Sequence, residues 1–175
     1  MKGKRMKITI VAAVNINNGI GKNNGEIPWH IPEDLKRFRS LTMDHHVIFG
    51  RKTWDTINKD LEGRKVIVLT KNPEEYKPGI QPVFIAQTLD EAINFAETAG
   101  EDNLFIAGGG MVYQKSIDLA DEILLTKILD DSPCDVFFPQ INYRRWKIVE
   151  ETLRNTNGNL YYYRKLERRA PSPDT

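Results

Sequence analysis

Apolar residues along the chain follow two alternating patterns. Short runs that are apolar and rich in β-branched residues predict buried strands, and apolar residues spaced three or four apart predict helices. The predicted strands cover residues 8–14, 46–49, 65–70, 82–86, 103–107 and 121–128. The predicted helices cover residues 33–42, 51–57, 89–99 and 111–117, and a capping-box pattern from Thr88 to Glu91 opens the third of them.

The order of these elements predicts the fold. Strands that alternate with helices indicate a parallel sheet covered on both faces. Residues 145–151 and 159–167 flank Asn157-Gly158, a dipeptide typical of a tight hairpin turn. We therefore predict an α/β fold with a mainly parallel central sheet of about eight strands, an antiparallel C-terminal hairpin and about four helices. A single domain over about residues 6–168 would carry a short N-terminal extension and, from Arg168, a disordered tail.

The loop predicted over residues 15–32 ends in an aromatic stretch bracketed by prolines. Pro28 and Pro32 fix φ and restrict the residues before them, so this stretch has few conformations available. Pro32 also suits the first turn of a helix, which places Asp34 in that turn. A carboxylate beneath a loop that carries Trp29 indicates a semi-buried pocket that binds a polar heterocycle and manages a proton.

The helix pattern around Asp34 also has an ordinary explanation. Leu35 and Phe38 form part of an apolar face at helical spacing, and Asp34 borders that face. An acid in a first turn interacts favourably with the helix dipole, and Glu33 with Arg37 would form a surface ion pair. The helix alone therefore does not identify a site, and the rest of the chain has to decide.

Composition and charge narrow the class of protein. Lys and Arg number 25 against 24 Asp and Glu, whereas a dedicated nucleic-acid binder is markedly basic. Because of this balanced charge, we expect no nucleic-acid partner. No apolar run approaches transmembrane length, so we expect no membrane partner either. The single cysteine, Cys134, excludes an intrachain disulfide and suits a reducing, cytoplasmic compartment. His45 and His46 precede a strand, where adjacent side chains point to opposite faces, so we predict no metal site.

Polar motifs follow several predicted strands, and ligands of open α/β sheets bind outside the carboxyl ends of strands. Two cationic segments and a glycine turn at one sheet edge indicate a cofactor that contains a diphosphate. The cations and hydroxyls near Arg51 and Thr70 favour NADPH over NADH. Each motif alone also fits an ordinary turn, and Arg64 fits either a carboxylate ligand or a surface cation. The motifs are Gly50-Arg51-Lys52-Thr53, Thr70-Lys71 and Gly108-Gly109-Gly110.

Taken in order, these motifs resemble the dihydrofolate reductase family over about residues 6–168. The resemblance implies NADPH-dependent reduction of dihydrofolate to tetrahydrofolate, by hydride transfer to C6 and protonation at N5. It also implies antifolate binding and a monomer. Its landmarks include Ile27-Pro28-Trp29, Pro32-Glu33-Asp34-Leu35, Gly50-Arg51-Lys52-Thr53-Trp54, Ala107-Gly108-Gly109-Gly110-Met111-Val112-Tyr113 and Asp135-Val136-Phe137-Phe138-Pro139.

The resemblance also implies a role for individual residues. The catalytic residues would be Asp34, Trp29, Tyr113 and Thr126. The substrate would contact Asp34 and Thr126 together with Val11, Ala12, Leu35, Phe38, Arg39, Ile57, Leu61 and Arg64. The cofactor would contact Ala13, Ile20, Gly21, Gly50, Arg51, Lys52, Thr53, Leu69, Thr70, Lys71, Ala107, Gly108, Gly109, Gly110, Met111, Val112 and Tyr113.

Three further features follow from the resemblance. The peptide bond between Gly108 and Gly109 would be cis, the loop over residues 15–32 would act as a lid, and Asp135 would steady that lid. Two positions depart from the family pattern: Ala107 is small where a larger aliphatic residue is frequent, and Met111 replaces a basic residue found in some relatives.

Two other functions remain open at this point. A reductase of riboflavin synthesis with the same fold uses NADPH on a pyrimidine sugar, although Asp34, Phe38 and Arg64 favour a pterin that carries a glutamate. A nucleotide-binding module without catalysis would use the same cofactor residues, and Arg164-Lys165 with Arg168-Arg169 would contact nucleic acid.

Overall fold

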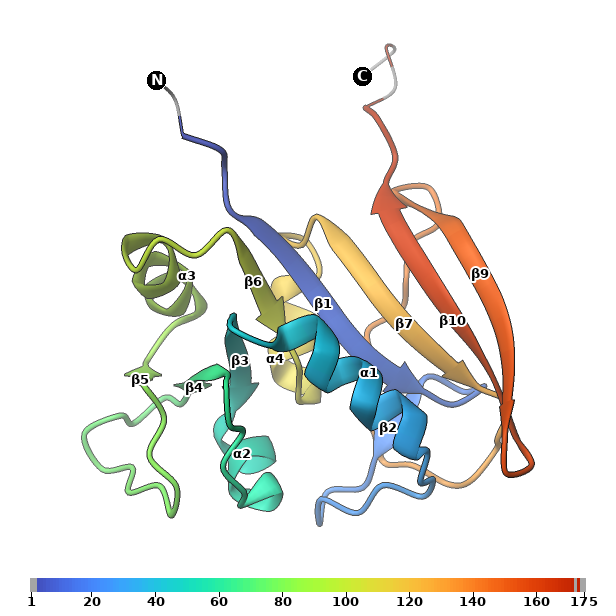
Figure 1. Ribbon diagram of the computed structural model, residues 1–175, viewed down its shortest axis with the longest axis horizontal. Coiled ribbons are helices and arrows are strands. Elements are labelled where there is room, and N and C mark those ends of the chain that lie inside the picture. The colour runs from blue at the N-terminus through green and yellow to red at the C-terminus, as the bar shows by residue number, and fades with distance from the viewer. Residues whose placement is uncertain (1–2, 172, 174–175) are drawn as a thin grey trace.

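A central eight-stranded sheet organises the computed structural model, which describes residues 3–171 and 173 (Figure 1). The strand order is β5-β4-β3-β6-β1-β7-β10-β9. Neighbouring strands are parallel from β5 to β7, whereas β10 is antiparallel to both of its neighbours, β7 and β9. The strands of this sheet are β1 (Lys7–Val14), β3 (His46–Gly50), β4 (Lys65–Leu69), β5 (Phe84–Ala86), β6 (Asn103–Ile106), β7 (Glu122–Ile128), β9 (Trp146–Thr156) and β10 (Asn159–Arg168). The predicted fold class is confirmed.

Helices cover both faces of the sheet. In the view of Figure 1, α1 lies in front of β1 and α4 lies behind the sheet. The helices are α1 (Pro32–Thr42), α2 (Arg51–Ile57), α3 (Leu89–Thr98) and α4 (Gly110–Ser116). Side chains of α3 and α4 pack in the main core with Ile10 and Ile106, whereas α1 and α2 pack on a second cluster around Phe49 and Val68. The sheet therefore separates two apolar layers, and the second cluster borders the candidate site.

The predicted hairpin is confirmed, and it is longer than the sequence pattern suggested. Asn157 and Gly158 have φ of 50° and 84°, as a type I′ turn requires. β9 extends to Thr156, beyond the predicted end at residue 151. Most residues of β9 are exposed on both faces, so its second half lacks the apolar residues from which strands were predicted.

The long loop after β1 contains a strand that the sequence did not indicate. β2 (Gly19–Gly21) pairs with β8 (Val136–Phe137) in a separate two-stranded sheet. Two of the three residues of β2 are glycines, which carry no strand propensity, so only the distant partner makes this segment a strand. This pairing joins the predicted lid to the segment that begins at Asp135.

The predicted disordered tail begins too early. The side chain of Arg168 donates from Nε to the carbonyl of Ala120 at 2.7 Å, and its guanidinium lies 4.5 Å from the centre of the Trp146 ring. The backbone N–H of Arg169 donates to the carbonyl of Arg145 at 2.7 Å. Both arginines therefore belong to the folded chain. Residues 172, 174 and 175 lie outside the described residues. Within residues 3–171, no helix is long and apolar enough to cross a membrane.

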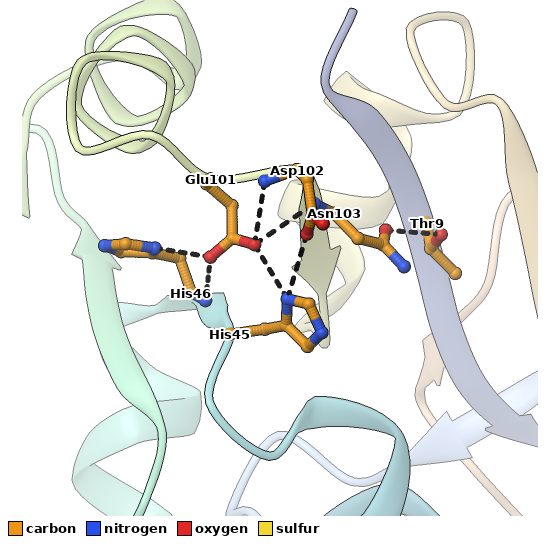
Figure 2. A network of polar contacts seen from close by, with 6 residues as sticks. All are labelled: Thr9, His45, His46, Glu101, Asp102 and Asn103. Carbon is orange, nitrogen blue, oxygen red and sulfur yellow. Dashed lines mark hydrogen bonds and ion pairs between the residues drawn. The ribbon is translucent and has the colours of Figure 1, made fainter. Parts of the chain in front are cut away.

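At the amino end of β3, the two adjacent histidines share one carboxylate (Figure 2). His45 Nδ1 lies 2.7 Å from Oε1 of Glu101, and His46 Nδ1 lies 2.6 Å from Oε2. The two rings lie toward opposite faces of the sheet, as expected for adjacent strand residues. The ring centre of His45 lies 5.4 Å from that of Phe105 in the second cluster, and that of His46 lies 6.0 Å from that of Phe95, which packs on the main core.

The carboxylate of Glu101 is fully engaged. Oε1 also accepts from the backbone N–H groups of Asp102 and Asn103, and Oε2 from that of His46. The side chains of Glu101 and His46 are only 5% and 4% exposed. Atoms of His45, Glu101 and Asp102 lie within 4.8 Å of one another, as the ligands of a cation would. Since the oxygens of Glu101 already accept from these N–H groups, we assign the cluster a structural role.

Candidate functional site

Asp34 contacts the sheet at one defined point. Its Oδ1 accepts a hydrogen bond of 2.7 Å from the hydroxyl of Thr126 on β7, which is 2% exposed. Thr126 is paired with Ala13 of β1 on one side and with Tyr163 of β10 on the other. These three residues form a row across the sheet, and the first turn of α1 lies over that row. The helix thereby holds a carboxylate above the carboxyl-terminal half of β1 and β7.

Opposing effects set the ionisation of Asp34. Burial raises the pKa of its carboxyl group, whereas the hydrogen bond from Thr126 and the positive charge of Arg37 lower it, and burial prevails. The two tyrosines near this carboxylate stay neutral, because burial and the charge of Asp34 raise the pKa of Tyr113 and Tyr163. A carboxyl group whose pKa is raised in this way is suited to hydrogen-bonding a heterocycle and to acid–base work.

Most of the apolar residues predicted to contact the substrate lie together, and we call them the apolar wall. Its members come from β1, α1, the end of α2 and the turn that follows α2, and they pack on the second apolar cluster. Leu35 is 60% exposed on the same helix as Phe38, so it remains available to contact a ligand. The residues that pack on this cluster are Val11, Phe38, Ile57 and Leu61 of the predicted substrate contacts and Ala107 of the predicted cofactor contacts. Trp29 packs on a third cluster with Ala13 and Tyr163.

Two arginines mark one end of this wall. Burial, followed by the charge of Arg39, lowers the pKa of Arg64. Arg64 is held by a hydrogen bond of 2.9 Å from Nε to the carbonyl of Glu62, and its NH1 lies 3.5 Å from the Thr42 hydroxyl. Like charges that are held close together favour an anionic ligand, and a carboxylate can bind a guanidinium in a bidentate manner.

The predicted cofactor motifs meet at the carboxyl ends of β3, β4 and β6. The N–H of Gly50 donates to the carbonyl of Gly108 at 2.7 Å, which joins the first motif to the glycine turn. Gly50 is also paired with Leu69, the residue before Thr70. The exposed side chains of Arg51, Lys52 and Lys71 therefore belong to adjacent strand ends. The peptide bond between Gly108 and Gly109 is cis, as expected.

Close backbone packing explains the glycines of this region. A Cβ at Gly109 would lie 2.7 Å from the Thr53 hydroxyl, and one at Gly50 would lie 3.1 Å from Val112. Without a Cβ at these positions, the Thr53 hydroxyl and the backbone of the glycine turn can lie side by side next to the cations, as a phosphate cradle requires. The residues present thus fit a dinucleotide that carries an additional phosphate.

The predicted lid is anchored by its partner strand and by two polar side chains. Asp135 Oδ1 accepts from the N–H of Asn23 at 2.6 Å, which matches the predicted role of Asp135. Asn15 is buried and accepts from the N–H groups of Asn17 and Gly19 at 3.0 and 2.8 Å. Ile20 lies 3.9 Å from a Cβ built at Gly110, so β2 borders the glycine turn.

Some predicted site residues do not present their side chains to the site. Ala12, Leu69 and Val112 are buried in the main core, on the sheet face opposite the row that contains Ala13. Gly21 is buried in β2, and Met111 is exposed. Arg39 is also exposed, but it lies near Arg64 at the end of the wall. The hydroxyl of Tyr113 donates to the carbonyl of Val11 at 2.7 Å, so its contact is with the strand beneath the site.

The surroundings of Asp34 include two residues that sequence reasoning did not assign. Arg37 was expected to pair with Glu33, but its guanidinium carbon lies 4.2 Å from the centre of the Tyr163 ring. Arg37 follows Asp34 by three residues on the same helix, which was the available signal. Nothing in the pattern of β10 indicated that Tyr163 would lie opposite Thr126.

Comparisons with known proteins agree with this geometry. Residues 7–168 match the family described as dihydrofolate reductase. The dihydrofolate reductase of Haemophilus influenzae is 34% identical over 157 residues, which cover 90% of this chain and 94% of that protein. The Bacillus subtilis enzyme is 33% identical, over 91% of this chain and 92% of its own length.

A solved structure resembles the whole fold. Dihydrofolate reductase from Enterococcus faecalis, complexed with NADP(H) and the compound RAB-propyl, superposes with a TM-score of 0.85 at 28% identity. The match covers 94% of this chain and 97% of the other. The family match, the relatives and the shared fold agree, and the chain belongs to the dihydrofolate reductase family.

Proposed function

We propose that this protein catalyses the NADPH-dependent reduction of 7,8-dihydrofolate to 5,6,7,8-tetrahydrofolate, with hydride transfer to C6 and protonation at N5. The observation that supports this most directly is the carboxylate of Asp34, which Thr126 holds beside an apolar wall. Membership in the family and the complex of the Enterococcus faecalis relative with NADP(H) support the same reaction.

The pterin would be held by Asp34 and Thr126. A carboxylate accepts two parallel hydrogen bonds, which fits the amino group and adjacent ring nitrogen of a pterin. The negative charge of Asp34 also favours a protonated substrate, and water would carry the proton to N5. The benzoyl extension would lie on the wall of Leu35, Phe38 and Ile57, and an antifolate with a similar diaminopyrimidine would use the same carboxylate.

NADPH would lie across the carboxyl ends of β3, β4 and β6. When bound, it supplies the hydride. Arg51, Thr70 and Lys71 would hold its 2′-phosphate, and Lys52 with Thr53 would hold the diphosphate beside the glycine turn. The lid that contains β2 would cover the nicotinamide end and exclude water.

The first test is the loss of NADPH absorbance when the purified protein is mixed with dihydrofolate, with NADH as the parallel cofactor. We expect rapid oxidation of NADPH that depends on dihydrofolate, and at least about tenfold slower oxidation of NADH at equal concentration, because the cations beside Thr70 have no phosphate to bind. Turnover of a pyrimidine sugar but not of dihydrofolate would favour the riboflavin-pathway reductase. Tight NADPH binding without turnover would favour the non-catalytic module.

The structure gives the non-catalytic module little support. Arg164 forms an ion pair of 2.7 Å with Glu151, and Lys165 lies 3.7 Å from Glu122. Arg168 donates to two backbone carbonyls. The basic residues that would contact nucleic acid therefore have partners within the fold.

Arg64 provides a separate test of the substrate. We expect Arg64→Leu to raise KM for dihydrofolate by about 10- to 100-fold, the cost of losing a hydrogen-bonded charge pair, with little change in kcat. A dihydropteridine without a glutamate should be reduced equally by both proteins. Arg154→Leu, at an exposed position of β9, is the matched control. An equal rise in KM for both substrates would show that Arg64 does not bind the glutamate carboxylate.

A further inference from the structure

Two residues of α1 contact two paired residues of the sheet. Asp34 and Arg37 lie one helical turn apart, and Thr126 and Tyr163 lie directly opposite each other on β7 and β10. Asp34 accepts from Thr126, and Arg37 lies over the ring of Tyr163 at 4.2 Å. The carboxylate of Asp34 and the guanidinium of Arg37 thus each contact one member of the Thr126–Tyr163 pair.

The ring of Tyr163 is itself held in place. It contacts Tyr161 edge to face, with ring centres 5.2 Å apart, and the hydroxyl of Tyr161 lies 2.8 Å from the hydroxyl of Thr156. Tyr161 is fully buried, and Tyr163 packs with Trp29 on the third apolar cluster. An arginine on a fixed aromatic face loses much of its freedom, because the cation is attracted to the ring and its long side chain packs on it.

We propose that Tyr163 is a positioning residue that holds the guanidinium of Arg37 beside Asp34, and that this pair keeps the pterin-binding carboxylate ionised. The inference deepens the proposed function, because the ionised carboxylate is the form that would bind the pterin. The positive charge of Arg37, held on the Tyr163 ring, offsets part of the cost of burying the ionised carboxylate of Asp34. This assigns a role to two residues that are not among the predicted substrate contacts.

The electrostatic surroundings of Asp34 agree with this role. Burial raises the pKa of the carboxyl group, the hydrogen bond from Thr126 opposes this effect, and the positive charge of Arg37 opposes it further. Thr126 is the hydroxyl that bonds Asp34, and the nearby Tyr113 and Tyr163 stay neutral because burial and the charge of Asp34 raise the pKa of each. Removal of the charge of Arg37, or of the ring that fixes it, should therefore destabilise the ionised form.

Titration of Asp34 itself tests the proposal without any substrate. The protein is labelled with ¹³C at the aspartate carboxyl carbons, and the Asp34 signal is identified by its loss in Asp34→Asn. Arg37→Met should raise the titration midpoint of Asp34 by about half to one pH unit, as expected for a charge several ångströms away under partial screening. Tyr163→Leu should raise it in the same direction, and Tyr163→Phe, which keeps the ring, should titrate like the wild type.

The opposite face of β10 offers a matched control. Arg164 lies 5.2 Å from the centre of the Tyr162 ring, so Tyr162→Leu disrupts a similar stack that points away from Asp34. This variant should leave the midpoint unchanged. The double variant Arg37→Met/Tyr163→Leu should shift it no further than Arg37→Met alone, because the two residues act through one contact.

The titration midpoints of these variants decide whether Arg37 and Tyr163 have the proposed roles. An unchanged midpoint in Arg37→Met would overturn the role of Arg37, even if Tyr163→Leu proves too unstable to measure. A shift in Arg37→Met but not in folded Tyr163→Leu would overturn the positioning role of Tyr163. If dihydrofolate is a substrate, the acid limb of kcat/KM should move with the midpoint. A wild-type protein that fails to reduce dihydrofolate would contradict the proposed function, while the titration would still test the pair.

Discussion

Asp34→Asn is expected to lower kcat/KM for dihydrofolate at neutral pH by about 10²- to 10³-fold. The amide keeps the size of the side chain and accepts the hydrogen bond from Thr126, so the row across the sheet remains intact. It carries no negative charge and has one oxygen, so it cannot accept two N–H donors from a pterin or favour a protonated substrate. Binding of NADPH should be unchanged, because the cofactor residues lie at other strand ends.

Steady-state kinetics and a direct measurement of NADPH binding check this prediction together. Glu33→Gln, which neutralises the exposed acid next to Asp34 on the same helix, is the matched control and should keep normal activity. Unchanged turnover in Asp34→Asn would remove Asp34 from the catalytic centre. A parallel loss of NADPH binding would instead indicate that the substitution disturbs the sheet beneath both sites.

Glu101→Gln should have the largest effect on stability, lowering the free energy of unfolding by about 2–4 kcal/mol. One of the two carboxylate oxygens becomes an NH₂ group, which then faces donors from His46 or from the backbone of Asp102 and Asn103. At least one buried N–H group loses its acceptor. The cluster lies at the amino end of β3 (Figure 2), whereas Asp34 is bonded to Thr126 on β7, so kcat should change little in the folded protein.

Denaturant unfolding at neutral pH measures the loss, and Asp102→Asn is the control. Asp102 is the next acid in the chain, its side chain is 78% exposed, and it lies 3.7 Å from His45. Neutralising it should cost less than about 1 kcal/mol. If the two variants are equally stable, the cluster around Glu101 does not hold the chain together as proposed.

The same carboxylate contributes to acid sensitivity. Burial alone would raise the pKa of Glu101, but hydrogen bonds from His45, His46 and the backbone outweigh it and lower the pKa to about 2. Because this pKa is depressed in the folded state, the stabilisation is fully present above the unfolded value near 4.5 and is lost as the pH falls toward 2. The stability difference between wild type and Glu101→Gln should therefore shrink across this range.

The amino-acid sequence by itself determined the features that depend on neighbouring residues. The apolar run of β1, the proline-bracketed loop before α1 and the Asn157-Gly158 turn were predictable, because each is specified by local backbone preferences or by a short period. Asp34 was predictable as a candidate because its position in the first turn follows from Pro32. The family resemblance then supplied roles for residues that no local pattern distinguishes.

Only the tertiary structure decided which distant residues meet. Thr126 and Asp34 are 92 positions apart, and His46 and Glu101 are 55 apart, so no local period links them. β2 became a strand only through its pairing with β8, and Tyr163 came to lie beside Arg37 only through the register of β10 on β7. Register and packing are properties of the whole sheet, because they depend on how all its strands and helices bury their apolar surfaces together.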